Sequence, residues 1–513
     1  MAITLQRIAE LSEATLYGDG DVEVSSITLN SSELEPGSVF AALPGSRVHG
    51  ASFAAGTAAA AIVTDGSGWE ILQAAGETRP VVVVEDIRAV LGFISAEIYG
   101  WPSHDLCVLG VTGTSGKTTT SYLLEAGLLA AGHSVGLVGT TGTRINRQPI
   151  PTTLTTPEAP TLQRLFARMR DEGVTHVVME VSSHALELGR VRGTRFAVGG
   201  FSNLSQDHLD FHPTMEEYFQ AKALLFIGEQ AAEKSVICTD DEWGQRMAQA
   251  AVDAGKSPVR VSLKGNSADI SARLKEVEPT GAQDIELRMG EQSWNFTLPL
   301  PGEFNIANAA LACAMANSAG VEMNSFIAAI SDVAVPGRME RVNRGQDFIA
   351  VVDYAHKPAA VAAVLDTLSE QLDQAGTGGR IGIVVGAGGD RDSTKRPLMG
   401  QAAALRADYV VVTDDNPRTE DPAPIRAAVL QGARNAQSER NPTIVEEPSR
   451  AQAIDAVVSW ARPGDAVIVV GKGHEVGQIV GTETLHFDDR EELARALTST
   501  GSAAAVDRGT ENQ

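Results

Sequence analysis

Short apolar runs alternate with helical patterns along most of the chain. In the middle of the sequence, apolar runs predict strands at residues 107–111, 175–181, 198–201 and 236–239. Helical periodicity over residues 118–131 and 161–172 fills the spaces between these strands. Such alternation is typical of βαβ units and predicts a mainly parallel sheet, whose ligands are expected beyond the carboxyl ends of its strands.

The two ends of the chain also alternate between apolar runs and helical patterns. The C-terminal part has apolar runs at residues 349–352, 381–385, 409–413 and 466–470, each followed by glycine, proline or aspartate and then a helical pattern. The first hundred residues predict a strand at 81–84 and an alanine-rich helix at 54–61. Both ends therefore read as further α/β units.

Breaks in the pattern divide the chain into domains. Glycine and proline interrupt it at residues 99–105 and again at 335–338, where we also expect hinges. We predict an α/β protein of three domains: a small N-terminal α/β domain (1–103), a central domain with a mainly parallel sheet (104–335) and a Rossmann-like C-terminal domain (336–500). Residues 501–513 are expected to form a disordered tail.

Composition excludes several classes of protein. The 513 residues carry a formal net charge of −24, which disfavours nucleic acid as a partner. No apolar run reaches the roughly 18 residues that a membrane span needs, so we expect a cytoplasmic protein without membrane insertion. The three cysteines have no paired spacing, which argues against disulfides and a cysteine-bound zinc site.

The strongest local motif is GVTGTSGKTTT at residues 110–120, between a predicted strand and a predicted helix. Glycines let backbone N–H groups converge on phosphate oxygens, a lysine reaches the outer phosphates, and a threonine hydroxyl can bind Mg²⁺. The motif departs by one place from the usual glycine spacing, but its context favours a nucleoside triphosphate. The predicted ATP-binding residues of this loop are Gly113, Thr114, Ser115, Gly116, Lys117, Thr118 and Thr119.

Acidic and histidine residues follow two other predicted strands. Glu180 ends an apolar run, a position suited to a magnesium ligand. The segment SQDHLDFH at residues 205–212 adds two histidines and two aspartates, but helix capping by Asp207 or a core histidine explains it equally well.

Taken together, these motifs resemble the Mur ligases, the ATP-dependent amide-forming enzymes of bacterial cell-wall precursor synthesis. The resemblance runs through nearly the whole chain in order and spacing. Its motifs are GVTGTSGKTTT, TTPEA, MEVSSHAL, NLSQDHLDFH, YFQAKALLF, LPGEFNIANAALA, VPGRMERV, DYAHKP, GDRDSTKRPLM, DDNPR and GKGHE.

The resemblance implies a three-domain ligase that adds the third amino acid to UDP-N-acetylmuramoyl-L-alanyl-D-glutamate. ATP would phosphorylate a substrate carboxylate to an acyl phosphate, and the amine of the incoming amino acid would then displace phosphate. It also implies that Thr118, Glu180 and His208 hold Mg²⁺ while Lys117 neutralises the phosphates. The further nucleotide contacts that it implies are Asn305, Arg338 and Asp353.

The role expected for Lys222 comes from the resemblance and not from the hydrophobic pattern or the motif spacing. A lone lysine on a helix is ordinarily a solvated charge. In the resembling enzymes the equivalent lysine is carbamylated, which converts an ammonium into a carboxylate-like group that orients Mg²⁺. The resemblance therefore implies a carbamylated Lys222 among the catalytic residues Lys117, Glu180 and His208.

The resemblance also assigns residues to the uridine-nucleotide substrate. The contacts that it implies in the first domain are Leu29, Ser31, Ser46, Arg47 and Val48. Those that it implies for the muramoyl dipeptide are Thr155, Thr156, Ser182 and Arg190, the last suited to pairing with an anionic group. Lys357, after DYAH, replaces a small polar residue that is common in relatives.

The incoming amino acid is expected to be meso-diaminopimelate, with L-lysine as the alternative. Diaminopimelate has a second carboxylate, which needs a fixed cation, and DNPR supplies Arg418. The residues that the resemblance assigns to this pocket are Arg391, Asp415, Asn416, Pro417, Arg418, Gly471 and Glu475.

Two other functions remain open at this point. A folylpolyglutamate synthetase shares the ATPase core but needs neither a uridine-nucleotide domain nor DNPR. A P-loop protein that is not a ligase would hydrolyse ATP without two organic substrates. We expect a monomer that acts on small molecules.

Overall fold

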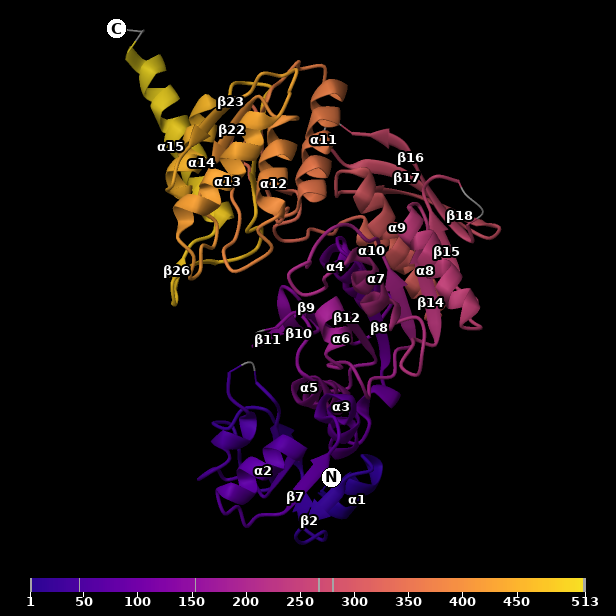
Figure 1. Ribbon diagram of the computed structural model, residues 1–513. Coiled ribbons are helices and arrows are strands. Elements are labelled where there is room, and N and C mark those ends of the chain that lie inside the picture. The colour runs from indigo at the N-terminus through magenta and orange to yellow at the C-terminus, as the bar shows by residue number, and fades with distance from the viewer. Residues whose placement is uncertain (1, 46, 153, 266–267, 279–280, 511–513) are drawn as a thin grey trace.

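The computed structural model describes residues 2–45, 47–152, 154–265, 268–278 and 281–510, with side chains described up to Ser499. Three sheets, each built from one continuous segment, follow one another along the chain (Figure 1). The N-terminal sheet and the C-terminal sheet lie at opposite ends of this view, and the middle sheet connects them. Among the described residues no helix is both long enough and apolar enough to cross a membrane.

The N-terminal sheet has five strands in the order β2-β7-β6-β5-β4 and is parallel except at β2. Its elements, with the small β1–β3 pair, are β1 (Ile3–Thr4), α1 (Leu5–Leu11), β2 (Thr15–Tyr17), β3 (Glu23–Val24), β4 (Ser26–Thr28), β5 (Ser38–Ala42), η1 (Gly50–Phe53), β6 (Ala61–Asp65), α2 (Gly66–Ala74), β7 (Val81–Val84) and α3 (Ile87–Ile98).

The middle sheet has eleven strands in the order β11-β10-β9-β12-β8-β13-β14-β15-β16-β17-β18. It is parallel from β9 to β16, and an antiparallel extension flanks it on either side. The strands are β8 (Cys107–Thr112), β9 (Val135–Gly139), β10 (Gly142–Ile145), β11 (Gln148–Ile150), β12 (His176–Glu180), β13 (Val198–Phe201), β14 (Lys234–Cys238), β15 (Val259–Ser262), β16 (Ile270–Val277), β17 (Gln283–Met289) and β18 (Gln292–Leu298).

Helices cover both faces of the parallel part of the middle sheet, which explains why β8, β9 and β12 are buried along nearly their whole length. Val108 packs into the core on one face and Leu109 into the core on the other, as the two-residue period of a strand requires. The helices are η2 (Pro102–His104), α4 (Lys117–Ala130), α5 (Ala159–Asp171), α6 (Ser183–Glu187), α7 (Met215–Ala223), α8 (Glu242–Asp253), α9 (Glu303–Ser318) and α10 (Met323–Ile330).

The C-terminal sheet has six strands in the order β19-β20-β24-β21-β22-β23 and is parallel except at β19. Its elements are β19 (Glu340–Arg341), β20 (Ile349–Asp353), α11 (Pro358–Gln374), β21 (Ile381–Val385), α12 (Lys395–Ala404), β22 (Tyr409–Val412), α13 (Pro422–Asn435), β23 (Thr443–Glu446), α14 (Arg450–Trp460), β24 (Ala466–Val470), the hairpin β25 (Gly477–Val480) and β26 (Glu483–His486), and α15 (Asp489–Thr510).

Two sequence predictions are wrong. Residues 54–61 do not form a helix: Gly56 adopts a left-handed backbone with φ 73°, and strand β6 begins at Ala61. The expected disordered tail is largely helical, because α15 continues to Thr510 through an alanine-rich stretch that favours helix. Residues 511–513 lie outside the described part of the chain.

The N-terminal and middle domains meet along a tight contact between α3 and the loop before β13. A side chain added at Gly92 would overlap the carbonyl group of Arg192, and Gly193 faces the carbonyl group of Gly92 in the same way. The first domain therefore packs against the middle domain through a close backbone-to-backbone contact, which only glycine permits at these two positions.

This contact gives a prediction for Gly92→Ala. In an isolated helix, replacing glycine by alanine would stabilise the helix by about 1 kcal/mol. Here overpacking should lower the free energy of unfolding by about 1–3 kcal/mol, which calorimetry would record as a lower melting temperature. Gly66→Ala, at the start of α2, is the control, because nothing lies within 4 Å of its added Cβ. A Gly92→Ala protein as stable as the Gly66→Ala protein would contradict the packing argument.

Candidate active site

The predicted phosphate-binding loop connects β8 to α4. Gly113 and Gly116 have φ angles of 146° and 89°, which side-chain-bearing residues rarely adopt. Helix α4 begins at Lys117, and the first backbone N–H groups of a helix have no partner within the helix itself. The loop and the helix start together form an anion-binding geometry.

Asn203, for which the sequence suggested no role, holds this loop from the end of β13. Its backbone carbonyl accepts from Thr114 N at 2.9 Å. Its side chain accepts from Ser115 N at 3.0 Å and donates to Ser115 O at 3.2 Å. The only sequence signal for this role is its position directly after a strand, at the start of NLSQDHLDFH.

Three lysine ammonium groups converge on two neighbouring carbonyl groups of the loop. Lys117 Nζ donates to Gly113 O at 2.8 Å and to Thr114 O at 3.2 Å. Lys222 Nζ donates to Gly113 O at 2.9 Å, and Lys357 Nζ donates to Thr114 O at 2.9 Å. Lysines that share an acceptor lie within about 6 Å of each other, close enough for like charges to disfavour one another.

Burial and mutual repulsion shift Lys117 and Lys222 toward their neutral forms. The pKa of Lys117 is lowered to about 8, first by burial and then by Lys357. Lys222 is 1% exposed, and its pKa lies well below the ordinary value because of burial and then because of Lys117 and Lys357. The cluster therefore favours anionic ligands and leaves the Lys222 amine nucleophilic.

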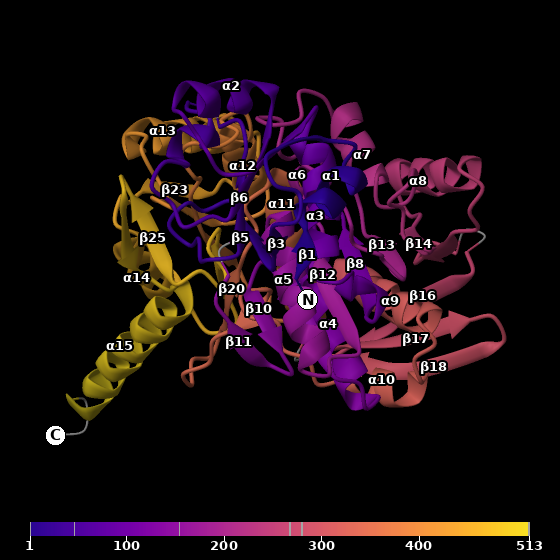
Figure 2. The same cartoon turned by 90° about the horizontal axis from the view of Figure 1, so that it is seen from below.

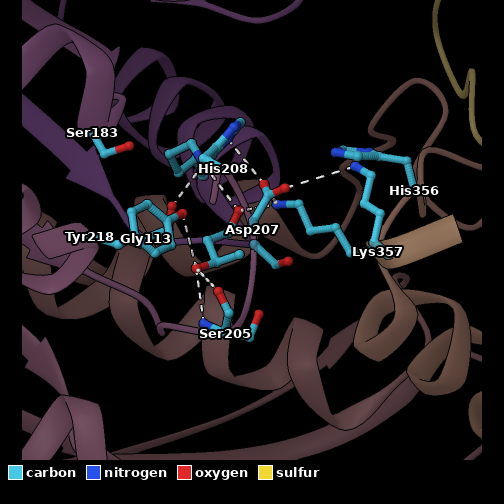
Figure 3. A network of polar contacts seen from close by, with 12 residues as sticks. Gly113, Ser183, Ser205, Asp207, His208, Tyr218, His356 and Lys357 are labelled. Atoms are coloured by element: carbon cyan, nitrogen blue, oxygen red, sulfur yellow. Dashed lines mark hydrogen bonds and ion pairs between the residues drawn. The ribbon is translucent and has the colours of Figure 1, made fainter. Parts of the chain in front are cut away.

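Asp207 is the carboxylate that faces this cluster (Figure 3). Its oxygens lie 2.9 Å from Lys357 Nζ, 3.9 Å from Lys395 Nζ and 3.0 Å from His208 Nε2. Burial, the largest single effect, would raise the pKa of Asp207, but the neighbouring cations led by Lys357 keep it well below its usual range. Because Lys357 and Lys395 belong to the C-terminal domain, Asp207 joins that domain to the middle one.

Glu180 and Thr118 lie together, as the sequence predicted. Glu180 is 1% exposed and accepts a 3.0 Å hydrogen bond from Thr118 Oγ1 and 2.9 Å bonds from both the amide and the hydroxyl of Thr140. Mg²⁺ is usually held by one or two protein oxygens together with phosphate and water oxygens. The hydroxyl–carboxylate pair beside the loop fits that ligand set.

His208 is engaged elsewhere than at this pair. It has a left-handed backbone with φ 54°, its Nε2 lies 3.0 Å from Asp207, and its side chain is 42% exposed. Over the described ranges, no group of three or more His, Cys, Asp or Glu side chains is arranged to hold a metal ion. Of the expected set, Thr118 hydrogen-bonds to Glu180, Lys222 donates to Gly113 O, and His208 lies beside Asp207.

The three nucleotide contacts expected outside the loop differ in what they do. Arg338 reaches the loop, since its Nη2 donates to Thr118 Oγ1 at 3.2 Å. Asn305 is buried and donates to Pro301 O at 2.7 Å. Asp353 instead makes contacts within the C-terminal domain, where it accepts 2.7 Å hydrogen bonds from the amides of Met339 and Ala355.

The residues expected to contact the muramoyl dipeptide flank Glu180. Thr156 Oγ1 donates to Glu180 O at 2.8 Å and accepts from Ser182 N at 3.2 Å. Thr155 Oγ1 lies 3.2 Å from Thr140 Oγ1, and Arg190 pairs with Glu158 at 2.8 Å. Substrate oxygens at this position would therefore lie next to the phosphate-binding loop.

The residues expected to contact the uridine nucleotide follow two parallel strands of the N-terminal sheet. Leu29 and Ser31 come after β4, and Arg47 and Val48 come after β5, where Val48 is 51% exposed. Ligands of parallel sheets bind at such carboxyl ends. Ser46 lies outside the described residues.

The predicted amino-acid pocket lies at the carboxyl ends of β21, β22 and β24. Asn416 Nδ2 donates to Glu475 Oε2 at 3.0 Å, and Arg418 Nη1 donates to Gly389 O at 2.8 Å. Asp415 lies beside Gly471, whose φ is 119°. Arg391 is exposed on the loop after β21, and Pro417 continues the motif toward Arg418. In the view of Figure 2, the C-terminal domain, which holds this pocket, and the N-terminal domain overlap in projection.

Comparison with known proteins agrees with the motif resemblance. Residues 111–316 match the Mur ligase middle domain, and residues 337–473 match the Mur ligase, glutamate ligase domain. A Corynebacterium glutamicum protein named UDP-N-acetylmuramoyl-L-alanyl-D-glutamate–2,6-diaminopimelate ligase is 60% identical over 93% of both chains. A Streptomyces avermitilis protein of the same name is 47% identical over 94% of both chains.

Solved structures give the same picture. A structure titled as the same diaminopimelate ligase has a TM-score of 0.68 at 31% identity and covers 98% of this chain and 100% of its own. A Mycobacterium tuberculosis folylpolyglutamate synthase has a TM-score of 0.59 at 20% identity, shows the fold alone and covers 74% of this chain and 91% of its own. The motifs, both matched domains and relatives spanning nearly the whole chain agree: this chain belongs to the Mur ligase family.

Proposed function

We propose that the protein is an ATP-dependent ligase that adds meso-2,6-diaminopimelate to UDP-N-acetylmuramoyl-L-alanyl-D-glutamate. The observation that carries the proposal is the convergence of Lys117, Lys222 and Lys357 on the phosphate-binding loop at the junction with the domain that holds DNPR. The relatives named as this ligase support the choice of substrates. We further propose that it acts in the cytoplasm as a monomer, on small molecules rather than nucleic acid.

The loop residues would bind ATP and polarise its terminal phosphate. The backbone N–H groups between Gly113 and Thr119 would surround the phosphate oxygens, while Lys117 and Lys357 neutralise their charge. Mg²⁺ would be held by Thr118 and Glu180 and would supply further charge neutralisation. Thr156, Ser182 and Arg190 would hold the acceptor carboxylate in line with the phosphate.

The product would form by two displacements. The substrate carboxylate oxygen attacks the terminal phosphorus of ATP, and ADP leaves, so that an acyl phosphate forms. The amine of diaminopimelate, held by the C-terminal domain, then attacks the acyl carbon; inorganic phosphate leaves and the amine loses a proton. Excluding water from the closed junction protects the acyl phosphate from hydrolysis.

Lys222 is proposed to act as a carbamate. Carbamylation requires a neutral amine, and burial near two other lysines favours that form. The product is an anion next to Lys117 and Lys357. The repulsion between Lys222 and these two lysines would then become attraction, which stabilises the carbamate. A carbamate there would also bring an oxygen ligand to a metal site that so far has only Thr118 and Glu180.

Diaminopimelate is preferred to L-lysine because of Arg418. Bound L-lysine would leave the guanidinium without the carboxylate that the DNPR loop is built to receive. Of the other candidates, a folylpolyglutamate synthetase is disfavoured because the matched structure covers 74% of this chain, whereas the diaminopimelate ligase structure covers 98%. A P-loop protein that is not a ligase does not require the acidic and basic groups collected after β21, β22 and β24.

The reaction itself is the first test. Purified protein with Mg²⁺ and ATP should release ADP only when both the muramoyl dipeptide and an amino acid are present. We expect kcat/KM for meso-diaminopimelate to exceed that for L-lysine by roughly a thousandfold, because L-lysine lacks the carboxylate with which Arg418 would pair and a site built for a polar partner rejects an analogue without it. ADP release at full rate with neither substrate would refute the ligase function, and equal use of L-lysine would refute the choice of amino acid.

Lys222→Ala tests the carbamate. We expect kcat to fall by at least about a hundredfold, as when a preorganised charged group is removed. Lys234→Ala is the control, since Lys234 is exposed and donates to Ser318 O far along the chain from the loop. With ¹³C-labelled bicarbonate, the ligand-free wild-type and Lys234→Ala proteins should show a carbamate carbon signal in NMR. Full activity of Lys222→Ala, or the same signal in that variant, would contradict the assignment.

A further inference from the structure

Lys472, in the GKGHE motif, is a buried cation beneath the predicted amino-acid pocket. Its side chain is 0% exposed. Its Nζ donates 2.7 Å hydrogen bonds to Asn416 Oδ1 and Gly477 O. The same nitrogen lies 3.5 Å from Asp415 Oδ1 and 3.9 Å from Glu475 Oε2. One ammonium thus contacts three of the side chains expected to recognise the incoming amino acid.

The side chain of Asn416 is committed to the protein rather than to a ligand. Its amide nitrogen donates to Glu475 Oε2 at 3.0 Å. Its oxygen accepts from Lys472 Nζ at 2.7 Å and from Ile479 N at 3.0 Å. An ammonium can only donate and a carboxylate can only accept, so this is the one amide orientation that satisfies both neighbours. Asn416 therefore connects Lys472 to Glu475.

The hairpin β25–β26 fixes the other side of the DNPR loop. Gln478 Nε2 donates to Asp415 O at 2.7 Å. The backbone of Arg418 donates to Ile479 O at 3.0 Å and accepts from Gly481 N at 2.7 Å. Because Lys472 also bonds Gly477 O at the start of the hairpin, it links the hairpin and the DNPR loop at one point.

Two carboxylates lie around this point. Asp415 is 7% exposed, and its buried Oδ1 accepts no hydrogen bond from the side chains and backbone that the structure describes, while Lys472 Nζ lies 3.5 Å away. Glu475 presents its carboxylate beside it, and burial followed by the charge of Asp415 raises the pKa of Glu475. Lys472 lies between these two acids and offsets the repulsion between them.

We propose that Lys472 is a positioning residue for diaminopimelate recognition: it fixes Asp415, Asn416 and Glu475 in one arrangement from below the pocket and does not touch the substrate. This inference rests on the proposed function. It predicts that Lys472 determines the affinity for a zwitterionic amino-acid head group and leaves the ATP and uridine-nucleotide sites unaffected.

Lys472→Met, which keeps the length of the side chain but removes the charge and the donors, tests this role. We expect KM for meso-diaminopimelate to rise roughly 10- to 100-fold, because misplacement of recognition groups by about 1 Å has effects of this size. KM for ATP and for the muramoyl dipeptide should change less than about twofold, a split that general destabilisation would not produce. If Lys472→Met does not fold, Lys472→Gln, which keeps a donor, is measured against the same expectation.

Arg380→Met is the matched control. Arg380 pairs with Asp465 near the start of β21, at the opposite end of the same sheet, so its loss should lower stability without changing KM for diaminopimelate. Equal KM for diaminopimelate in wild type and Lys472→Met, or a uniform rise in all three KM values, would overturn the proposal. If the wild-type enzyme does not couple diaminopimelate at all, the proposed function fails before the variants are compared.

Discussion

The arrangement of the active site depends on excess positive charge held against the phosphate-binding loop. Lys117, Lys222 and Lys357 donate to the carbonyl groups of Gly113 and Thr114, and Asp207 is the carboxylate that faces them. These lysines could carry more positive charge than Asp207 balances, and burial and mutual repulsion shift Lys117 and Lys222 toward their neutral forms. The site is therefore most favourable when a triphosphate, and a carbamate at Lys222, supply the missing negative charge.

This requirement explains why the site lies between domains. The middle domain supplies the loop and Asp207. Lys357 reaches the loop from beyond the predicted hinge at residues 335–338, and Arg338 reaches it from within that hinge. Asp353 holds Met339, the residue after the hinge, by accepting from its amide. Binding of phosphate would thus favour the closed arrangement, in which the carboxyl ends of the middle and C-terminal strands face a common space.

The sequence predicted best what depends on local pattern. Strands at 198–201, 381–385 and 466–470 agree with the structure residue for residue, because strands buried on both faces are continuous apolar runs. The loop at 110–120 and the Thr118–Glu180 pair were also predictable, since each follows a strand. The helix expected at 54–61 was not correct, because the backbone at Gly56 overrode the preference of alanine.

Contacts between distant segments could not be read from the sequence. Asp207 and Lys357 are far apart along the chain, and neither periodicity nor spacing indicates that they pair. Asn416 was expected among the diaminopimelate contacts, but its hydrogen bonds with Lys472 and Ile479 had no signal in the sequence. Roles of this kind follow from tertiary packing, which brings together residues whose local sequence is unremarkable.

Calorimetric titration of Lys357→Met with a nonhydrolysable ATP analogue and Mg²⁺ tests the dependence on charge most directly. If Lys357 neutralises the triphosphate, the analogue should bind roughly tenfold or more weakly than to wild type, since hydrogen bonds to charged groups contribute about 1.5–3 kcal/mol. Affinity for the muramoyl dipeptide alone should stay the same. Unchanged affinity for the analogue would contradict the account.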